Sequence, residues 1–398
     1  FVAYGAAEGG RDYDVADISE RTLHEVYLPP FKAAVDAGAQ SIMAAFNEIA
    51  GVPMHAHRPL IEDLLRKEWG WDGLLVSDYT GVMELMPHGV AADRKQAGAL
   101  GLRAGVDVDM VSQIYVKDLP AEVKAGRVPM AQVDASVRRV LNAKYRLGLF
   151  ENPYRSCTDD GAHERAMTLT PEHRADARRM AQKSLVLLEN DNDVLPLSKS
   201  VRTLAVIGPL ADHRRAMLGN WAVAGREEDA VTPIEGLKAA LGDGTRLVIA
   251  KGADIDSQDT SGFAQAVAAA KQADAVVMFL GEHPDMSAEA NNRTSLDLPG
   301  VQEQLALAVA ATGKPVVAVL LNGRPLSIGG LKGKVPAILE AWFPGVEGGH
   351  AITDVLFGDV NPSAKLPVTF PHNVGQVPIY YAHKNTGRPP SEQEKYTS

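Results

Sequence analysis

Short apolar segments alternate with amphipathic helical segments in two separate series, and this alternation limits the possible folds more than any other feature of the chain. In the first series, the expected strands are 1–4, 41–46, 73–77 and 106–110, and the expected helices are 19–37, 59–69, 93–104, 117–125 and 130–147. Ser19 and Asp93 are placed to cap helix starts, and Gly38 and Gly105 stand where helix ends favour glycine. Such a strand–helix repeat predicts a parallel sheet.

The first series has too few strands for a closed barrel of alternating strands and helices, because such a barrel needs eight. The segment is therefore either a small open α/β sheet or half of a barrel. Hydrophobic periodicity alone leaves both possibilities open.

A second series follows a polar stretch at 151–171 and a predicted helix at 172–188. Its expected strands are 204–207, 246–250, 275–280, 315–321 and 337–341, and its expected helices are 233–241, 263–272, 299–311 and 348–357. This pattern predicts a doubly wound α/β domain. We therefore divide the chain into an α/β segment at 1–150, a linker with a bridging helix at 151–200, a second domain at 201–371 and a linker or tail at 372–398.

Composition narrows the class of protein. Apolar residues make up 45% of the 398 residues and charged residues 23%, as in ordinary globular proteins. The formal charge of −10 gives no general attraction to nucleic acid, and no apolar run approaches the ~20 residues that span a bilayer. Cys157 is the single cysteine, so no intrachain disulfide forms. The chain starts at Phe1, and we expect it to begin after processing or inside a longer protein.

Motifs for common cofactors are missing from the sequence. No glycine-rich dinucleotide fingerprint follows a strand, and the stretch 330–334 resembles a phosphate loop but is followed by Val335 instead of Ser or Thr. His55 and His57 are spaced to share a metal, yet no third ligand is near in sequence, so polar loop residues are the favoured interpretation. We expect no metal and no organic cofactor.

Acidic residues at the ends of predicted strands are the candidates for chemistry. Asp78 ends the apolar run 73–77, and functional groups of parallel α/β folds gather at the carboxyl ends of strands. The alternative role for Asp78 is a helix cap or a turn. Asp107 and Asp109 lie at the next strand and are weaker candidates. In the second series, Glu282 and Glu289 lie in a long polar loop after the strand 275–280, where a solvated acidic loop is the alternative.

Several motifs together resemble glycoside hydrolase family 3 β-glucosidases, in particular the periplasmic bacterial ones, over essentially the whole chain. They are AYGAAEGGRDY at 3–13, WGWDG at 69–73, VSDY at 76–79, KYRLGLF at 144–150, LLEN at 187–190, LPL at 195–197, LDLPG at 296–300, WFPG at 342–345, NP at 361–362 and KLP at 365–367. Ala364 departs from the glycine that is usual in the last of these.

The resemblance implies a fold and a site. The fold is the C-terminal half of a TIM-like (β/α) barrel followed by an α/β sandwich domain. Asp78 matches the catalytic nucleophile and Glu289 the acid/base, with Glu282 as its rival. Substrate-binding residues by the same resemblance are Tyr79, Met43 and Arg293. A retaining glycosidase holds its two carboxyl groups ~5–5.5 Å apart.

The resemblance also implies an activity, which is release of terminal β-D-glucose from β-glucosides and oligosaccharides by an exo-acting, retaining enzyme in the periplasm or outside the cell. The alternatives are a β-xylosidase of the same family and an incomplete fragment that only binds sugar or has a structural role. A β-N-acetylglucosaminidase is less favoured, because those relatives find their acid in the barrel domain. We expect the first half of the barrel, with a Lys–His pair that binds glucose, to lie before Phe1, and a fibronectin-like domain to follow Ser398.

Overall fold

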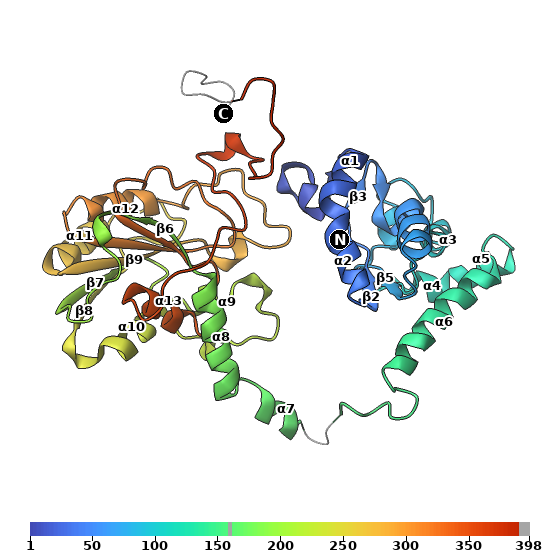
Figure 1. Cartoon of the computed structure of the whole chain (residues 1–398), viewed down its shortest axis with the longest axis horizontal. Helices are drawn as coiled ribbons and strands as arrows, with labels where there is room; N and C mark the ends of the chain where they lie inside the picture. Colours follow the sequence, from blue (N-terminus) through green and yellow to red (C-terminus); the bar gives the residue numbers. More distant parts are fainter. Residues whose placement is uncertain (158–160, 390–398) are drawn as a thin grey trace. The chain divides into compact units, whose positions relative to one another are not determined.

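The computed structural model describes residues 1–157 and 161–389, which belong to two compact units, Phe1–Ala162 and His163–Ser398 (Figure 1). The four-part division predicted from the sequence stays a prediction. Within the described residues, no helix combines the length and the apolar character that crossing a membrane requires.

The first unit is built on a short parallel pair of strands. β2 (Ser41–Met43) pairs with β5 (Leu74–Val76), so that Met43 lies beside Val76. Val108 continues the same edge through a single parallel bridge to Val76. Three further strands, β1 (Val15–Ala16), β3 (Glu48–Ile49) and β4 (Val52–Pro53), form a small separate sheet that the sequence did not predict.

Helices connect and cover these strands. They are α1 (Glu20–Thr22), a π-helical turn at Leu23–Tyr27, α2 (Leu28–Asp36), a π-helical segment at Pro59–Glu68, α3 (Arg94–Ala104), α4 (Ile114–Lys117), α5 (Leu119–Lys124) and α6 (Met130–Arg146). The predicted caps are present: the Ser19 side chain accepts from the Thr22 N–H, and the Asp93 side chain accepts from the Gln96 N–H. Gly105 ends α3 with a φ of 106°.

Two predicted strands of this unit are wrong. Residues 1–4 form a turn that leads into a 3₁₀ helix at Tyr4–Ala6, because Ala3 takes a left-handed φ of 59° that a strand does not allow. The segment 106–110 makes only the single bridge at Val108, since the left-handed Val111 and the turn that follows it end the pairing. Apolar runs this short mark buried backbone without fixing its conformation.

The second unit contains a six-stranded sheet within its described residues, with the strand order β6–β11–β10–β9–β7–β8. The strands are β6 (Val186–Asn190), β7 (Thr203–Ile207), β8 (Arg246–Ala250), β9 (Ala275–Gly281), β10 (Val316–Leu321) and β11 (Ala337–Glu340). All are parallel except β6, which pairs antiparallel with β11. The helices are α7 (Ala162–Met167), α8 (Pro171–Ser184), α9 (Arg214–Leu218), α10 (Pro233–Leu241), α11 (Phe263–Gln272), α12 (Gln302–Ala310) and α13 (Gly348–Leu356).

Helices cover both faces of this sheet, as the doubly wound pattern predicts. Alternate side chains of β9 point to opposite faces: Val277 and Phe279 pack with α10 and α13, whereas Val276 and Met278 pack with α11 and α12. The predicted helix at 172–188 is too long. It ends at Ser184, and the apolar residues that follow it enter β6, because pairing with β11 satisfies their backbone inside the core.

Candidate active site

Asp78 lies two residues after the end of β5, at the carboxyl end of the β2–β5 pair. Met43 ends β2 and pairs with Val76, so the structure places the predicted substrate-binding residue Met43 at the same edge as Asp78. Asp78 is half-buried, and one of its carboxylate oxygens, Oδ1, accepts the Tyr79 N–H at 2.8 Å. Tyr79 is 59% exposed.

The backbone of Asp78 is held from both sides. Its N–H donates to Nε2 of His55 at 3.0 Å, and its carbonyl accepts from Oγ of Ser77 at 2.8 Å and from the Gly81 N–H at 3.0 Å. His55 is 2% exposed, and burial lowers the pKa of its imidazole to about 3. The ring is therefore neutral at pH 7, and the hydrogen bond from Asp78 assigns its one proton to Nδ1, so that Nε2 accepts.

Gly81 makes room for this histidine. A Cβ atom at position 81 would lie 2.2 Å from the His55 ring. The sequence identified His55 only as half of a doubtful metal pair, whereas the structure shows it supporting the backbone of Asp78. The one signal that could have found it is the combination of a histidine on one segment with a glycine just after the strand-end acid.

Replacing His55 by phenylalanine keeps a planar ring beside Gly81 but removes the acceptor for the Asp78 N–H. We expect this variant to lower the free energy of unfolding by about 1–3 kcal/mol, because it leaves a partly buried donor unpaired. His55→Gln, whose amide oxygen can take the place of Nε2, is expected to lose about half of that or less. Urea unfolding of the two variants measures the difference, and equal losses would show that the ring itself, not its acceptor, matters.

The two weaker candidates at this edge, Asp107 and Asp109, make polar contacts within the first unit. The Asp107 side chain is fully buried and accepts from Arg66 at 2.8 Å and from the Leu75 N–H at 2.9 Å. Asp109 accepts the Ile114 N–H at 2.7 Å at the start of α4. Both carboxylates therefore join neighbouring segments of the first unit.

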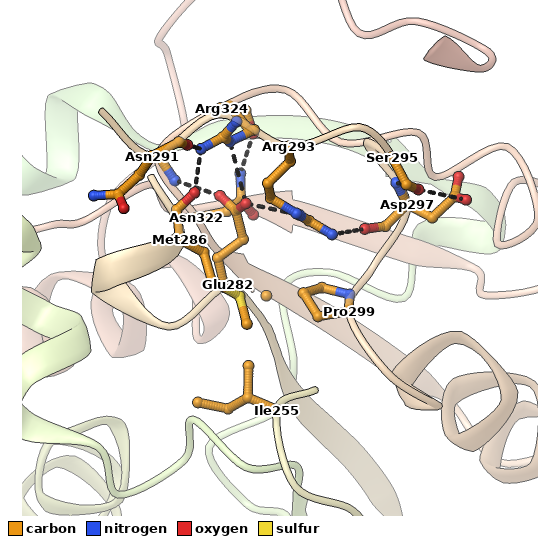
Figure 2. A network of polar contacts seen from close by, with 12 residues as sticks. Ile255, Glu282, Met286, Asn291, Arg293, Ser295, Asp297, Pro299, Asn322 and Arg324 are labelled. Atoms are coloured by element: carbon orange, nitrogen blue, oxygen red, sulfur yellow. Dashed lines mark hydrogen bonds and ion pairs between the residues drawn. The ribbon is translucent and has the colours of Figure 1, made fainter. Parts of the chain in front are cut away.

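The second unit carries Glu289 on the loop that follows β9. Glu289 is exposed, whereas Glu282, at the start of the same loop, has no exposed surface. Oε1 of Glu282 lies 2.7 Å from a terminal guanidinium nitrogen of Arg293 and 3.2 Å from Nε of Arg324 (Figure 2). A carboxylate buried between two guanidinium groups is a structural anchor, so the geometry favours Glu289 over its rival as the group that meets a ligand.

Arg293, predicted to bind substrate, has protein partners in the structure. One terminal nitrogen of its guanidinium group pairs with Glu282, and the other donates to the carbonyl of Asp297 at 2.9 Å (Figure 2). Its predicted contact with a ligand stays a prediction. The sequence missed Arg324 altogether, although a basic residue just after the apolar run of β10 is a signal of the kind that pointed to Asp78.

A second buried carboxyl group lies beside this cluster. Glu340 ends β11 with no exposed surface, and its side chain accepts the Trp342 N–H at 2.8 Å and lies 3.2 Å from Nδ2 of Asn322. Burial raises the pKa of Glu340 to about 8, with a smaller contribution from Glu282. Glu340 is therefore protonated at neutral pH.

In residues 1–157 and 161–389, no three His, Cys, Asp or Glu side chains gather closely enough to hold a metal ion. His57 instead accepts the Leu60 N–H at 3.4 Å at the start of the helical segment Pro59–Glu68.

Models of two known domains match nearly the whole chain. Residues 1–143 match the glycosyl hydrolase family 3 N-terminal domain, and residues 185–398 match the glycosyl hydrolase family 3 C-terminal domain. The chain belongs to glycoside hydrolase family 3.

Curated relatives in family 3 carry two kinds of name. A periplasmic β-glucosidase of Salmonella typhimurium is 45% identical over 100% of this chain and 55% of its own length. A β-xylosidase of Formosa agariphila is 42% identical over 96% of this chain and 54% of its own length. The chain therefore spans about half the length of these relatives.

Solved structures agree with the family and with the predicted fold. A mutant β-glucosidase from Listeria innocua in complex with laminaribiose superposes with a TM-score of 0.95 at 39% identity, over 100% of this chain and 54% of that one. The predicted fold class, the second half of a TIM-like barrel followed by an α/β sandwich, is confirmed. The roles of Asp78, Glu289, Tyr79, Met43 and Arg293 stay predictions.

Proposed function

We propose that the protein containing this chain is a retaining, exo-acting β-glucosidase in which Asp78 is the nucleophile and Glu289 the acid/base. The observation that carries the proposal is the placement of Asp78. Its carboxylate stands at the carboxyl end of β5, oriented by the Tyr79 N–H and held through its backbone by His55, in a chain that belongs to family 3.

The chemistry that we propose has two steps. In the first, the Asp78 carboxylate attacks the anomeric carbon of the terminal sugar while Glu289 gives its proton to the departing glycosidic oxygen. In the second, Glu289, now ionised, removes a proton from water, the water oxygen attacks the anomeric carbon, and the bond to Asp78 breaks. The second step returns the proton to Glu289 and frees the Asp78 carboxylate, so the cycle needs neither a metal nor an organic cofactor.

The substrates that we propose are β-glucosides and β-linked gluco-oligosaccharides. The β-glucosidase relative at 45% identity and the laminaribiose complex of a structural neighbour support this choice. The β-xylosidase relative at 42% identity supports a β-xylosidase as the second candidate. By analogy with the periplasmic relative, we infer export to the periplasm or beyond.

Hydrolysis of 4-nitrophenyl β-D-glucoside and β-D-xyloside by the full-length product of the gene tests the proposal. We expect kcat/KM for the glucoside to exceed that for the xyloside by about 10-fold or more, because a site that hydrogen-bonds the sugar's 6-hydroxyl group is left unpaired by xylose. The reverse order would make the protein a β-xylosidase. If the protein hydrolyses neither substrate, the glycosidase proposal is wrong. The 398-residue chain assayed alone shows whether this segment acts or only binds.

A further inference from the structure

The loop that carries Glu289 has little regular structure of its own. Between the end of β9 and the start of α12, its one helical turn is the 3₁₀ helix Pro284–Met286. Ala290, the residue after Glu289, takes a left-handed φ of 60°. For a residue other than glycine such a backbone costs about 1 kcal/mol or more and persists only where the surroundings hold it. Within the loop, the Asn291 side chain donates to the Glu289 carbonyl at 3.2 Å and the Asn291 N–H to the Ala288 carbonyl at 3.0 Å. Contacts from outside the loop add to this support.

Arg324 supplies that support. Its guanidinium group donates to the carbonyl oxygens of Met286 and Asn291, the second at 2.7 Å (Figure 2). These carbonyls flank Glu289 in the sequence, three residues before it and two residues after it. One side chain thus joins both sides of the turn that presents the carboxyl group.

Glu282 in turn holds Arg324 through an ion pair. The ion pair between Nε of Arg324 and Oε1 of Glu282 measures 3.2 Å, and the other oxygen of Glu282 accepts the Gly323 N–H at 3.3 Å. The same Glu282 anchors Arg293, which donates to the carbonyl of Asp297 further along the loop (Figure 2). Because Glu282 is fully buried, displacing either guanidinium group removes one of its two ion-pair partners at a site that water does not reach.

We propose that Arg324 is a positioning residue for Glu289. It acts through the two loop carbonyls to which it donates, and Glu282 holds its guanidinium group in place. The proposal rests on the proposed function, in which Glu289 protonates the leaving group. Lysine cannot replace Arg324 fully, because two carbonyls and a carboxylate around one planar guanidinium group need several donors in fixed directions.

The test separates a misplaced acid from a weakened fold by the leaving group of the substrate. The 2,4-dinitrophenolate group leaves its glucoside without protonation, whereas the 4-methoxyphenolate group leaves only when an acid protonates it. In the full-length product of the gene, we expect Glu289→Ala to lose about 10²–10³-fold in kcat/KM, which reports the first step, on the methoxyphenyl substrate and under about 10-fold on the dinitrophenyl substrate. On the dinitrophenyl substrate, kcat should fall because the second step has lost its base, and azide, which attacks in place of water, should recover part of it. This variant supplies the reference.

For Arg324→Met we expect the same pattern in kcat/KM at smaller size: a loss of about 10–100-fold on the methoxyphenyl glucoside and of under about 3-fold on the dinitrophenyl glucoside. Arg324→Lys keeps the charge beside Glu282 and should fold as the wild type does. We expect it to lose about 5–10-fold in kcat/KM on the methoxyphenyl glucoside and nothing on the dinitrophenyl glucoside. Arg226→Met is the matched control, because Arg226 is an exposed arginine of the same unit whose partners are Glu228 and Asp229, and it should change neither rate.

Each outcome decides between the two proposals. Equal losses on both substrates in the Arg324 variants, beside a leaving-group-dependent Glu289→Ala, overturn the positioning role and leave the proposed function in place. If Glu289→Ala itself loses equally on both substrates, Glu289 is not the acid, and the assignment under the proposed function falls with the positioning role. If Arg324→Met does not fold, Arg324→Lys decides by the same ratio of losses.

Discussion

Asp78→Asn should reduce kcat/KM for 4-nitrophenyl β-D-glucoside by more than about 10³-fold, which corresponds to more than about 4 kcal/mol of transition-state stabilisation. An amide does not attack the anomeric carbon, so the covalent route through Asp78 is lost. The asparagine oxygen can still accept the Tyr79 N–H, and the backbone bonds to His55 and Gly81 do not involve the side chain. The loss is therefore expected in a protein that unfolds at the same denaturant concentration as the wild type.

The control for this experiment is Asp72→Asn. Asp72 lies on the surface of the same unit, with a side chain 72% exposed and an ion pair to Arg146 at 3.0 Å, and its replacement should leave the rate within about 2-fold. A 2-deoxy-2-fluoroglucoside, which slows the second step, should trap the wild-type enzyme with the label on the peptide that contains Asp78. A label on any other carboxylate, or more than a tenth of the activity left in Asp78→Asn, would show that the nucleophile has been misassigned.

Glu340→Gln should make the stability of the second unit much less dependent on pH. Burial raises the pKa of Glu340 from 4.5 to about 8, so the folded state binds this proton more tightly than the unfolded chain does. Its contribution to stability is complete below about pH 4.5 and is lost as the pH rises to about 8, at about 1.4 kcal/mol per pH unit and about 5 kcal/mol in all. Glutamine keeps the shape of the protonated group and has no proton to lose.

Urea unfolding between pH 5 and pH 9 measures this effect. We expect the two proteins to differ little at pH 5, and the variant to become the more stable by several kcal/mol as the pH reaches about 8. Glu228→Gln serves as the control, because that side chain is 69% exposed and its removal should shift stability by the same small amount at every pH. Parallel pH curves for wild type and Glu340→Gln would contradict a neutral buried Glu340.

The second unit could be predicted closely from local patterns. The helices α10 and α11 and the strand β8 have the bounds predicted from the sequence. Thr232 begins α10 with a capping box, a signal contained in four consecutive residues. Where local patterns conflict with pairing, prediction failed: Val186 continues an apolar helical period, and only the partner strand β11 makes it part of β6.

The first unit shows the opposite balance. Its strands are two or three residues long, so a hydrophobic run such as 106–110 marks buried chain without fixing whether it pairs. The prediction of Asp78 at a strand end needed only one such run, and β5 ends two residues before it. The role of His55 was not predicted, because its contact with Asp78 joins positions 23 residues apart.

By itself, the sequence determined the alternation of strands and helices, the resemblance to family 3 and the position of Asp78, since each is written in a short stretch of residues. Only the tertiary structure decided what the buried polar groups do. It placed His55 under the backbone of Asp78, made Glu282 an anchor and not an exposed acid, and brought Arg324 to both sides of Glu289. The physical reason is that a buried polar group must find its partner wherever the folded chain brings one. No local sequence pattern shows which distant residue that partner is.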